Sequence, residues 1–411
     1  MAGLTSPGDC FAQDGALLSV EEAAALVSAR VAPLHGTEVV PLRAARGRVL
    51  AEDLAAPADL PPFANSAVDG YAFRRADLPP DRTLPLAARI AAGQPAVPLP
   101  PGSAARILTG APLPEGADAV AMQEETTSGG DAVTLPADLP AGANIRPAGE
   151  DLARGELALP AGHCLNAASI GLAAALGHPS LRVARRPLVG VFSTGDELVE
   201  PGQPLSPAAR HDSNRHTLLA LLDALPVEAR DLGILPDRAG ITAEALRAAA
   251  SAHDLLLTSG GVSAGEEDHV RQAIEAGGAL HFWKLAVKPG KPAAMGTIAG
   301  TPVLGLPGNP VAAVVGFLHL ARPLVLRLAG ARPQPLPRLM AAAAFAHRKK
   351  PGRREYLRVS LRDGEAHRYP RDGAGLIGSL ARTDALAELP EESTAVEPGS
   401  PLAVIPYAGL F

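Results

Sequence analysis

Three acidic side chains, Glu197, Asp237 and Asp268, each follow closely after a predicted strand. Because the carboxyl ends of parallel strands meet at one edge of a sheet, we expect these side chains to converge. Two carboxylates about 4 Å apart repel by roughly 4 kcal/mol at an effective dielectric near 20. If these side chains converge, protonation, a lysine or a divalent cation must offset that repulsion. Oxygen ligands without His or Cys favour magnesium bridged to phosphate. Each carboxylate taken singly is better explained as an ordinary helix cap.

Two glycine-bearing loops also follow predicted strands. One loop comes after the apolar run 254–258 and contributes Ser259, Gly260, Gly261, Ser263 and Gly265. The other comes after 303–306 and consists of Pro307, Gly308, Asn309 and Pro310. Backbone N–H groups of such loops and helix N-termini attract phosphate and other oxyanions. Either loop alone is better explained as a tight turn that needs glycine.

Three lysines, Lys284, Lys288 and Lys291, lie between the two loops. Lysine runs usually form a solvated face, but Pro289, Gly290 and Pro292 prevent a helix here and constrain the segment. The combination of two loops and three lysines therefore favours an anion site next to the acidic group.

The region 186–331 must position these residues, and it alternates strands with helices. Strands are expected at 188–192, 227–232, 254–258, 282–287 and 303–306, and helices at 214–225, 242–252, 266–276 and 311–328. This alternation is typical of a parallel α/β domain, whose ligands lie beyond the carboxyl ends of the strands.

The flanking regions differ in character. Residues 59–148 contain short apolar runs between Pro and Gly turns, which predicts a β-rich domain. This domain is inserted into a discontinuous first domain of residues 1–58 and 149–185, which opens with a capping box at Ser19 and Glu22. Residues 332–411, with strands at 356–361 and 402–405, predict a small all-β domain.

Composition excludes several classes of protein. The net charge of −6 argues against a general nucleic-acid surface. Cys10 and Cys164 form no CxxC pair, which argues against a disulfide framework and fits a cytoplasmic protein. We see no signal peptide and no continuous apolar run of about 18 residues, so no membrane association is expected.

The motifs of this chain closely resemble those of the molybdopterin molybdenumtransferase family, the bacterial MoeA type related to the gephyrin E domain. They run in family order over nearly the whole chain from Leu18 to about Gly330. The matching pieces are Asn65-Ser-Ala-Val-Asp-Gly-Tyr-Ala72, Arg106-Ile-Leu-Thr-Gly-Ala-Pro112, Asn144-Ile-Arg-Pro-Ala-Gly-Glu-Asp151, Ser193-Thr-Gly-Asp-Glu-Leu198, Asp212-Ser-Asn-Arg215, Thr258 to Asp268, Lys288-Pro-Gly-Lys-Pro292 and Gly305-Leu-Pro-Gly-Asn-Pro-Val311.

The resemblance implies four domains: an elongated N-terminal domain, an inserted β-rich domain, a molybdopterin-binding α/β domain and a C-terminal β-barrel. It implies a homodimer in which each active site is built from both subunits. Asp69, Thr109 and Asp151 would then be the contribution of the partner chain, and Glu197, Asp237 and Asp268 the magnesium and catalytic carboxylates.

The implied reaction takes adenylylated molybdopterin and molybdate and yields molybdenum cofactor and AMP. Lys284 and Lys288 would contact the pterin phosphate or molybdate, Pro307 and Pro310 would shape the molybdate pocket, and Lys291 would lie nearby. Further expected partners are the molybdopterin adenylyltransferase and acceptor apo-molybdoenzymes.

Two other functions fit parts of the same pattern. A scaffold or receptor-clustering role, as in the gephyrin relatives, goes with a preceding adenylylating domain and a long linker that this sequence lacks. An adenylyltransferase acting on molybdopterin itself would share the α/β domain type. The additional domains and the region around Asp69 favour the molybdenumtransferase.

Overall fold

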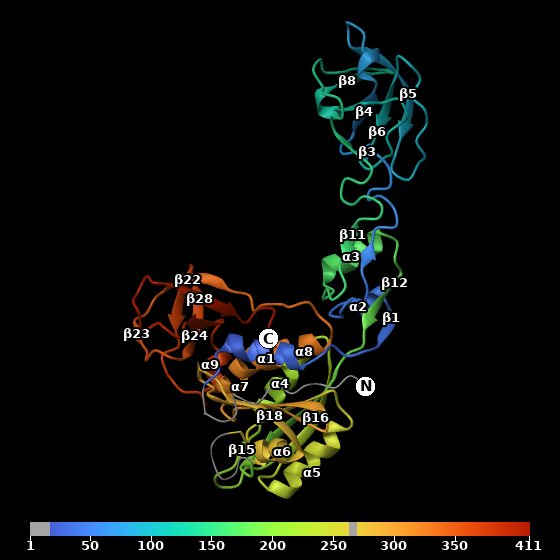
Figure 1. Ribbon diagram of the computed structural model, residues 1–411. Helices are drawn as coiled ribbons and strands as arrows, with labels where there is room; N and C mark the ends of the chain where they lie inside the picture. The colour runs from blue at the N-terminus through green and yellow to red at the C-terminus, as the bar shows by residue number, and fades with distance from the viewer. Residues whose placement is uncertain (1–16, 263–268) are drawn as a thin grey trace. The chain divides into compact units, whose positions relative to one another are not determined.

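The computed structural model describes residues 17–262 and 269–411 (Figure 1). Its internal contacts divide the chain into two compact units, which we describe separately. Unit 1 comprises residues 1–51, 162–166 and 181–411, and unit 2 comprises residues 52–161 and 167–180. Both units are discontinuous in sequence, and the boundaries of the four expected domains stay a prediction.

A six-stranded sheet in the order β16-β13-β17-β21-β20-β18 forms the centre of unit 1. Neighbouring strands from β16 to β21 are parallel, whereas β20 is antiparallel to both of its neighbours. The predicted parallel α/β domain is thus confirmed. The strands are β13 (Leu188–Thr194), β16 (Glu228–Leu235), β17 (Leu255–Ser259), β18 (Gly278–Lys284), β20 (Pro292–Ile298) and β21 (Thr301–Leu306).

Helices cover both faces of this sheet. Successive strand residues point to opposite faces, so Leu255 and Leu257 of β17 enter one core and Leu256 enters the other. The first core also contains side chains of α1 (Val20–Arg30), α4 (Asn214–Asp223) and α7 (Pro310–Gly316), and the second those of α5 (Ala239–Ala250) and α6 (His269–Gly277). This burial on both faces explains why β17 is apolar throughout.

Strand β20 was not expected from the sequence. Its residues Ala293, Ala294 and Gly296 are small, so the segment lacks the β-branched run that marks a strand. Packing requires the small residue at Gly296, because a Cβ there would lie 2.2 Å from Ile274 Cγ2. The expected strand at 282–287 instead covers 278–284, as the outer neighbour of β20.

The helical segment after β21 is continuous through α7, a π-helical turn η3 (Phe317–Ala321) and α8 (Arg322–Leu328). Among the described residues, this is one helix, Pro310–Leu328, that is long and apolar enough to cross a membrane. The sequence alone predicts no such segment, because no continuous apolar run approaches about 18 residues. However, 89% of its apolar window is buried inside the protein, as in the core helix of a soluble protein.

The C-terminal part of unit 1 is a closed five-stranded barrel, as the resemblance implied. Its strands close in the cyclic order β24-β25-β22-β28-β26, because β26 also pairs with β24. Their bounds are β22 (Leu339–Ala343), β24 (Arg354–Arg362), β25 (Glu365–Arg368), β26 (Ala385–Leu389) and β28 (Pro401–Pro406). Strand β19 (Val287–Lys288) adds to β24 and so joins the lysine segment to the barrel.

Short elements complete unit 1. The predicted capping box at the start of α1 is present. The Ser19 hydroxyl accepts a hydrogen bond from the Glu22 backbone N–H, and the Glu22 carboxylate accepts one from the Ser19 backbone N–H. The remaining elements are β1 (Thr37–Pro41), α2 (Leu42–Ala45), β12 (Ser180–Ala184), β14 (Leu198–Val199), β15 (Arg210–His211), β23 (His347–Arg348), α9 (Ile377–Leu380) and β27 (Ala395–Val396).

Unit 2 is rich in β-structure, as predicted, and its main sheet has the order β7-β4-β6-β5-β9-β8. The strands are β4 (Gly70–Phe73), β5 (Thr83–Ile90), β6 (Ala104–Ile107), β7 (Ala119–Met122), β8 (Thr127–Gly129) and β9 (Ala132–Thr134). The unit also contains β2 (Leu54–Ala55), β3 (Asn65–Ser66), η1 (Arg75–Asp77), η2 (Gln123–Glu125), β10 (Ile145–Arg146), β11 (Leu157–Leu159) and α3 (Ala167–Ala175).

Candidate active site

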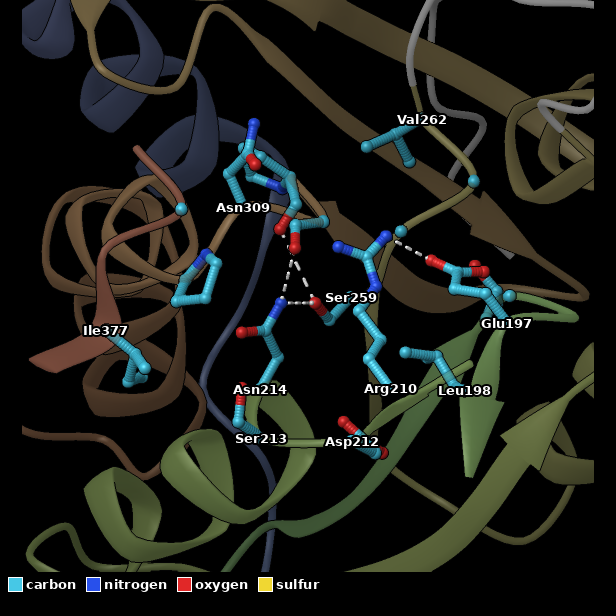
Figure 2. A pocket seen from close by; sticks show the side chains of 18 of the residues that line it. Glu197, Leu198, Arg210, Asp212, Ser213, Asn214, Ser259, Val262, Asn309 and Ile377 are labelled. Carbon is cyan, nitrogen blue, oxygen red and sulfur yellow. Dashed lines mark hydrogen bonds and ion pairs between the residues drawn. The ribbon is translucent and has the colours of Figure 1, made fainter. Parts of the chain in front are cut away.

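A cavity of about 810 Å³ opens at the carboxyl ends of the parallel strands of unit 1. Strands β13, β16, β17 and β21 end at Thr194, Leu235, Ser259 and Leu306, and the loops that follow all contribute to its wall. Figure 2 shows Asn214 and Ser259 side by side, and Arg210 pointing toward Glu197. The lining residues from these loops that the sequence predicted are Glu197, Asp237, Ser259, Gly260, Gly261, Pro307, Gly308, Asn309 and Pro310.

Glu197 and Asp237 occupy neighbouring loops of this cavity. The loops are tied by Asp196, whose Oδ1 accepts a hydrogen bond of 3.0 Å from the Asp237 backbone N–H. Glu197 folds back over Gly195, where a Cβ would lie only 2.3 Å from Glu197 Oε2. Its Oε1 accepts a hydrogen bond of 2.5 Å from Arg210 Nη2, so an arginine neutralises this carboxylate.

The loop Ser259–Gly261 approaches β13 very closely. Gly260 has a φ of +100°, and a Cβ there would lie 2.6 Å from Thr194 Oγ1. At Gly261, with φ +67°, a Cβ would lie 2.7 Å from Val270 Cγ2. Gly260 also donates its N–H to Leu306 O at 3.0 Å, so this group is used within the fold. The tight-turn explanation therefore accounts for both glycines, and their predicted role in binding an anion stays a prediction.

Asn214 is a cavity residue that the site prediction missed. Its Nδ2 donates to Ser259 Oγ at 2.7 Å and to Gly308 O at 2.9 Å, so it joins both glycine loops to the start of α4 (Figure 2). Asn214 is 8% exposed, and within the described chain its buried Oδ1 has no hydrogen-bond partner. The motif Asp212-Ser-Asn-Arg215 contained the only sequence signal for it.

Arg215, next to Asn214, anchors this wall of the cavity. The guanidinium is buried and contacts three carboxylates: Glu200 at 2.6 Å, Asp231 at 3.0 Å and Asp212 at 3.2 Å. Ser193 on β13 also donates to Asp212, at 3.0 Å. Strands β13 and β16, the loop after β14 and helix α4 are thereby held together beneath the cavity.

The predicted lysines do not line this cavity. Lys288 Nζ contacts Glu355 Oε1 at 2.8 Å, and both residues belong to a second cavity of about 510 Å³. The other residues lining the second cavity are Arg348, Lys349, Lys350 and Arg353. Lys284 ends β18, and Lys291 is exposed just before β20, where Pro292 does reach the first cavity. The segment 284–291, which carries the three lysines, therefore lies beside the barrel, because β19 pairs with β24.

Unit 2 brings together two of its three predicted site residues. Asp69 Oδ1 accepts hydrogen bonds from the Thr109 backbone N–H at 2.8 Å and from the Thr109 hydroxyl at 2.9 Å. These two bonds hold the pKa of the Asp69 carboxyl below its usual value, so it is ionised at neutral pH. Asp151 lies on a different loop, where its backbone N–H donates to Leu60 O at 2.9 Å. Ser263, Gly265 and Asp268 lie outside the described residues.

The donor set of the first cavity is compatible with magnesium. Within residues 17–262 and 269–411, no three His, Cys, Asp or Glu side chains are grouped closely enough to hold a metal ion. Magnesium, however, is commonly held by one or two protein carboxylates, with waters and substrate phosphate completing its coordination. Glu197 and Asp237, which both line this cavity, carry oxygen ligands of the type that such a site uses.

Three family models match most of the chain. Residues 18–177 match the MoeA N-terminal region (domains I and II), residues 190–327 match the probable molybdopterin binding domain, and residues 340–407 match the MoeA C-terminal region (domain IV). A MoeA protein from Pyrococcus horikoshii has a similar structure, with a TM-score of 0.83 and 30% identity over 95% of this chain and all of that one.

Curated relatives agree with these matches. The molybdopterin molybdenumtransferase of Haemophilus influenzae is 39% identical over 383 residues, which cover 91% of this chain and 95% of the relative. The molybdopterin molybdenumtransferase of Nostoc is 37% identical, covering 90% of this chain and 88% of the relative. The chain therefore belongs to the MoeA family of molybdopterin molybdenumtransferases, enzymes of the transferase class.

Proposed function

We propose that this protein inserts molybdenum from molybdate into adenylylated molybdopterin in the presence of Mg²⁺ and releases AMP. The observation that carries the proposal is that Glu197 and Asp237 meet both glycine loops in one cavity at the carboxyl edge of the parallel sheet. Its volume of about 810 Å³ lies in the range of small-molecule sites.

Glu197 and Asp237 would hold the magnesium ion in this cavity. When bound, the ion would offset negative charge on the phosphate groups of the substrate. Asn214 and Ser259 would orient the substrate, because their mutual hydrogen bond fixes the positions of both glycine loops. The closely packed turn at Gly260 would shape the wall next to the reacting group.

The second cavity supports a role for Lys288 in binding an oxyanion. Four further basic side chains surround Lys288 there, and Glu355 is the one carboxylate among the described residues of that wall. Lysine and arginine bind tetrahedral oxyanions through charge-assisted hydrogen bonds. Lys288 would contact molybdate or the pterin phosphate there.

We further propose a cytoplasmic homodimer. In this dimer, Asp69, Thr109 and Asp151 of one subunit would complete the active site of the other, as in the four-domain arrangement expected from the sequence. The hydrogen bonds from Thr109 to Asp69 support an ionised carboxylate in that role. Molybdopterin adenylyltransferase and apo-molybdoenzymes are the proposed upstream and downstream partners.

Substitution of the cavity carboxylates tests this function. Glu197→Gln and Asp237→Asn each remove one charged ligand, so we expect AMP release from adenylylated molybdopterin to fall by about 100-fold or more. AMP is measured by chromatography with molybdate and Mg²⁺ present, and circular dichroism verifies folding. Glu228→Gln, an exposed change on β16 outside the cavity, is the control.

Two outcomes would contradict the proposal. Release of AMP at the wild-type rate by both variants would exclude the carboxylate pair from the reaction. Formation of adenylylated molybdopterin from ATP and metal-free molybdopterin would instead identify an adenylyltransferase.

A further inference from the structure

Arg210 lies beside one of the two carboxylates proposed to hold magnesium. Its Nη2 donates to Glu197 Oε1 at 2.5 Å, as the dashed line in Figure 2 shows. The backbone maintains this neighbourhood, because β14 and β15 pair in parallel with Leu198 opposite Arg210. The Arg210 N–H also donates to Glu197 O at 2.9 Å. The contact is therefore built into the wall of the cavity.

The charges of this cavity are unevenly distributed. Among its described lining residues, Arg210 is the one lysine or arginine, whereas Glu197, Asp212 and Asp237 carry carboxylates. Asp212 is buried and already contacts Arg215 and Ser193. This leaves Glu197, part of the proposed metal site, as the cavity carboxylate that Arg210 contacts.

The ion pair between Arg210 and Glu197 is exposed enough for the two side chains to separate. The Arg210 side chain is 67% exposed and that of Glu197 is 37% exposed. Exposed ion pairs contribute little stability, equivalent to a shift of up to about five-fold in an equilibrium constant. A long, exposed arginine can therefore swing away from Glu197 at small cost and pair with another anion.

We propose that Arg210 is a resident counter-ion that competes with Mg²⁺ for Glu197 and, once displaced, binds the phosphate of the nucleotide. The inference rests on the proposed function, because it assumes a magnesium site at Glu197. A guanidinium and a metal ion repel each other, so a guanidinium held at Glu197 lowers the affinity of this carboxylate for the ion. The phosphate offers the displaced guanidinium a bidentate partner. Metal and nucleotide consequently bind cooperatively, each raising the affinity for the other by the same factor.

Calorimetric titration of the full-length chain with Mg²⁺, with and without saturating AMP, tests the proposal. In the wild type, we expect AMP to tighten Mg²⁺ binding. In Arg210→Gln, we expect Mg²⁺ to bind about five-fold more tightly than in the wild type when AMP is absent. AMP should then improve Mg²⁺ binding less in this variant than in the wild type.

A matched control is available on the same unit. Arg230 forms an exposed pair with Glu228, at 3.3 Å between Nη2 and Oε1, and does not line the cavity. Arg230→Gln changes net charge by the same amount as Arg210→Gln, so it should leave both Mg²⁺ titrations as in the wild type. This control separates a local effect from a change in overall charge.

If Arg210→Gln and the wild type bind Mg²⁺ with equal affinity when AMP is absent, the proposed competition is wrong. The same holds if neither protein binds Mg²⁺ detectably. If AMP tightens Mg²⁺ binding in Arg210→Gln by the same factor as in the wild type, the contact of Arg210 with phosphate is wrong. Glu197→Gln separates these failures from failure of the proposed function. If it abolishes Mg²⁺ binding while Arg210→Gln has no effect, only the inference about Arg210 is lost. If it binds Mg²⁺ like the wild type, the proposed metal site itself is wrong.

Discussion

Asn214 shows how much a single side chain contributes to the shape of the cavity. It donates one hydrogen bond to each glycine loop, and these loops are separated from it by 45 and 94 residues along the chain. A neutral hydrogen bond of this kind contributes about 1 kcal/mol, and a buried acceptor left without its donor costs a similar amount. The spacing between the loops therefore depends on this amide.

We expect Asn214→Ala to lower the free energy of unfolding by about 2 kcal/mol. We also expect it to reduce AMP release by about ten-fold or more, because the two loops lose their common donor. Urea denaturation and the AMP assay measure the two effects. Asp223→Ala, an exposed change on α4 outside the cavity, is a suitable control. Wild-type activity of Asn214→Ala would show that Asn214 does not position the loops.

At the scale of elements, the helical segment Pro310–Leu328 carries a buried titratable group. His319 lies in the π-helical turn η3, 4.8 Å from the Tyr356 ring between centroids. Burial lowers the pKa of His319 to about 4, an effect that Glu388 opposes and that Arg338 and Arg354 reinforce. Below pH 6.5 the unfolded chain binds a proton at this position, whereas the folded protein does not until about pH 4.

This difference predicts a pH-dependent stability. Between pH 7 and pH 5, His319 alone should reduce the free energy of unfolding by about 2 kcal/mol. His319→Phe keeps an aromatic ring beside Tyr356 but cannot bind the proton, so it should lose that part of the pH dependence. Urea denaturation at both pH values measures the effect, with the exposed His35→Gln as control. The same decrease in His319→Phe as in the wild type would contradict the assignment.

At the scale of the whole molecule, the proposed homodimer requires that two different defects complement each other. Asp69→Ala and Glu197→Ala chains should each be inactive alone, because every active site lacks one carboxylate. A heterodimer of the two contains one site with both defects and one intact site. It should therefore show about half of the wild-type activity.

Co-expression of the two chains with different tags, followed by purification on both tags, isolates this heterodimer for the AMP assay. Homodimers of each variant purified in the same way are the controls. A purified heterodimer without activity would exclude an active site shared between subunits. If no species carrying both tags can be recovered, the dimer itself is excluded.

Much of this molecule could be predicted from local sequence. The carboxyl ends of β13, β16, β17 and β21 share one edge of a parallel sheet, and each of these strands is a short segment bounded by turn residues. Residues that directly follow these strands must lie at that edge. The sequence therefore predicts that Glu197, Asp237 and both glycine loops lie together, and their described residues line one cavity.

Other features arise only from tertiary structure. Pairing of β14 with β15 places Arg210 beside Glu197, and pairing of β19 with β24 places Lys288 beside Glu355 of the barrel. Strand β20, rich in small residues, is likewise recognisable only from its neighbours. Local periodicity shows which residues form a strand and which side is buried, but it carries no information about the partner of a short strand. That partner is selected by packing between segments far apart in the chain.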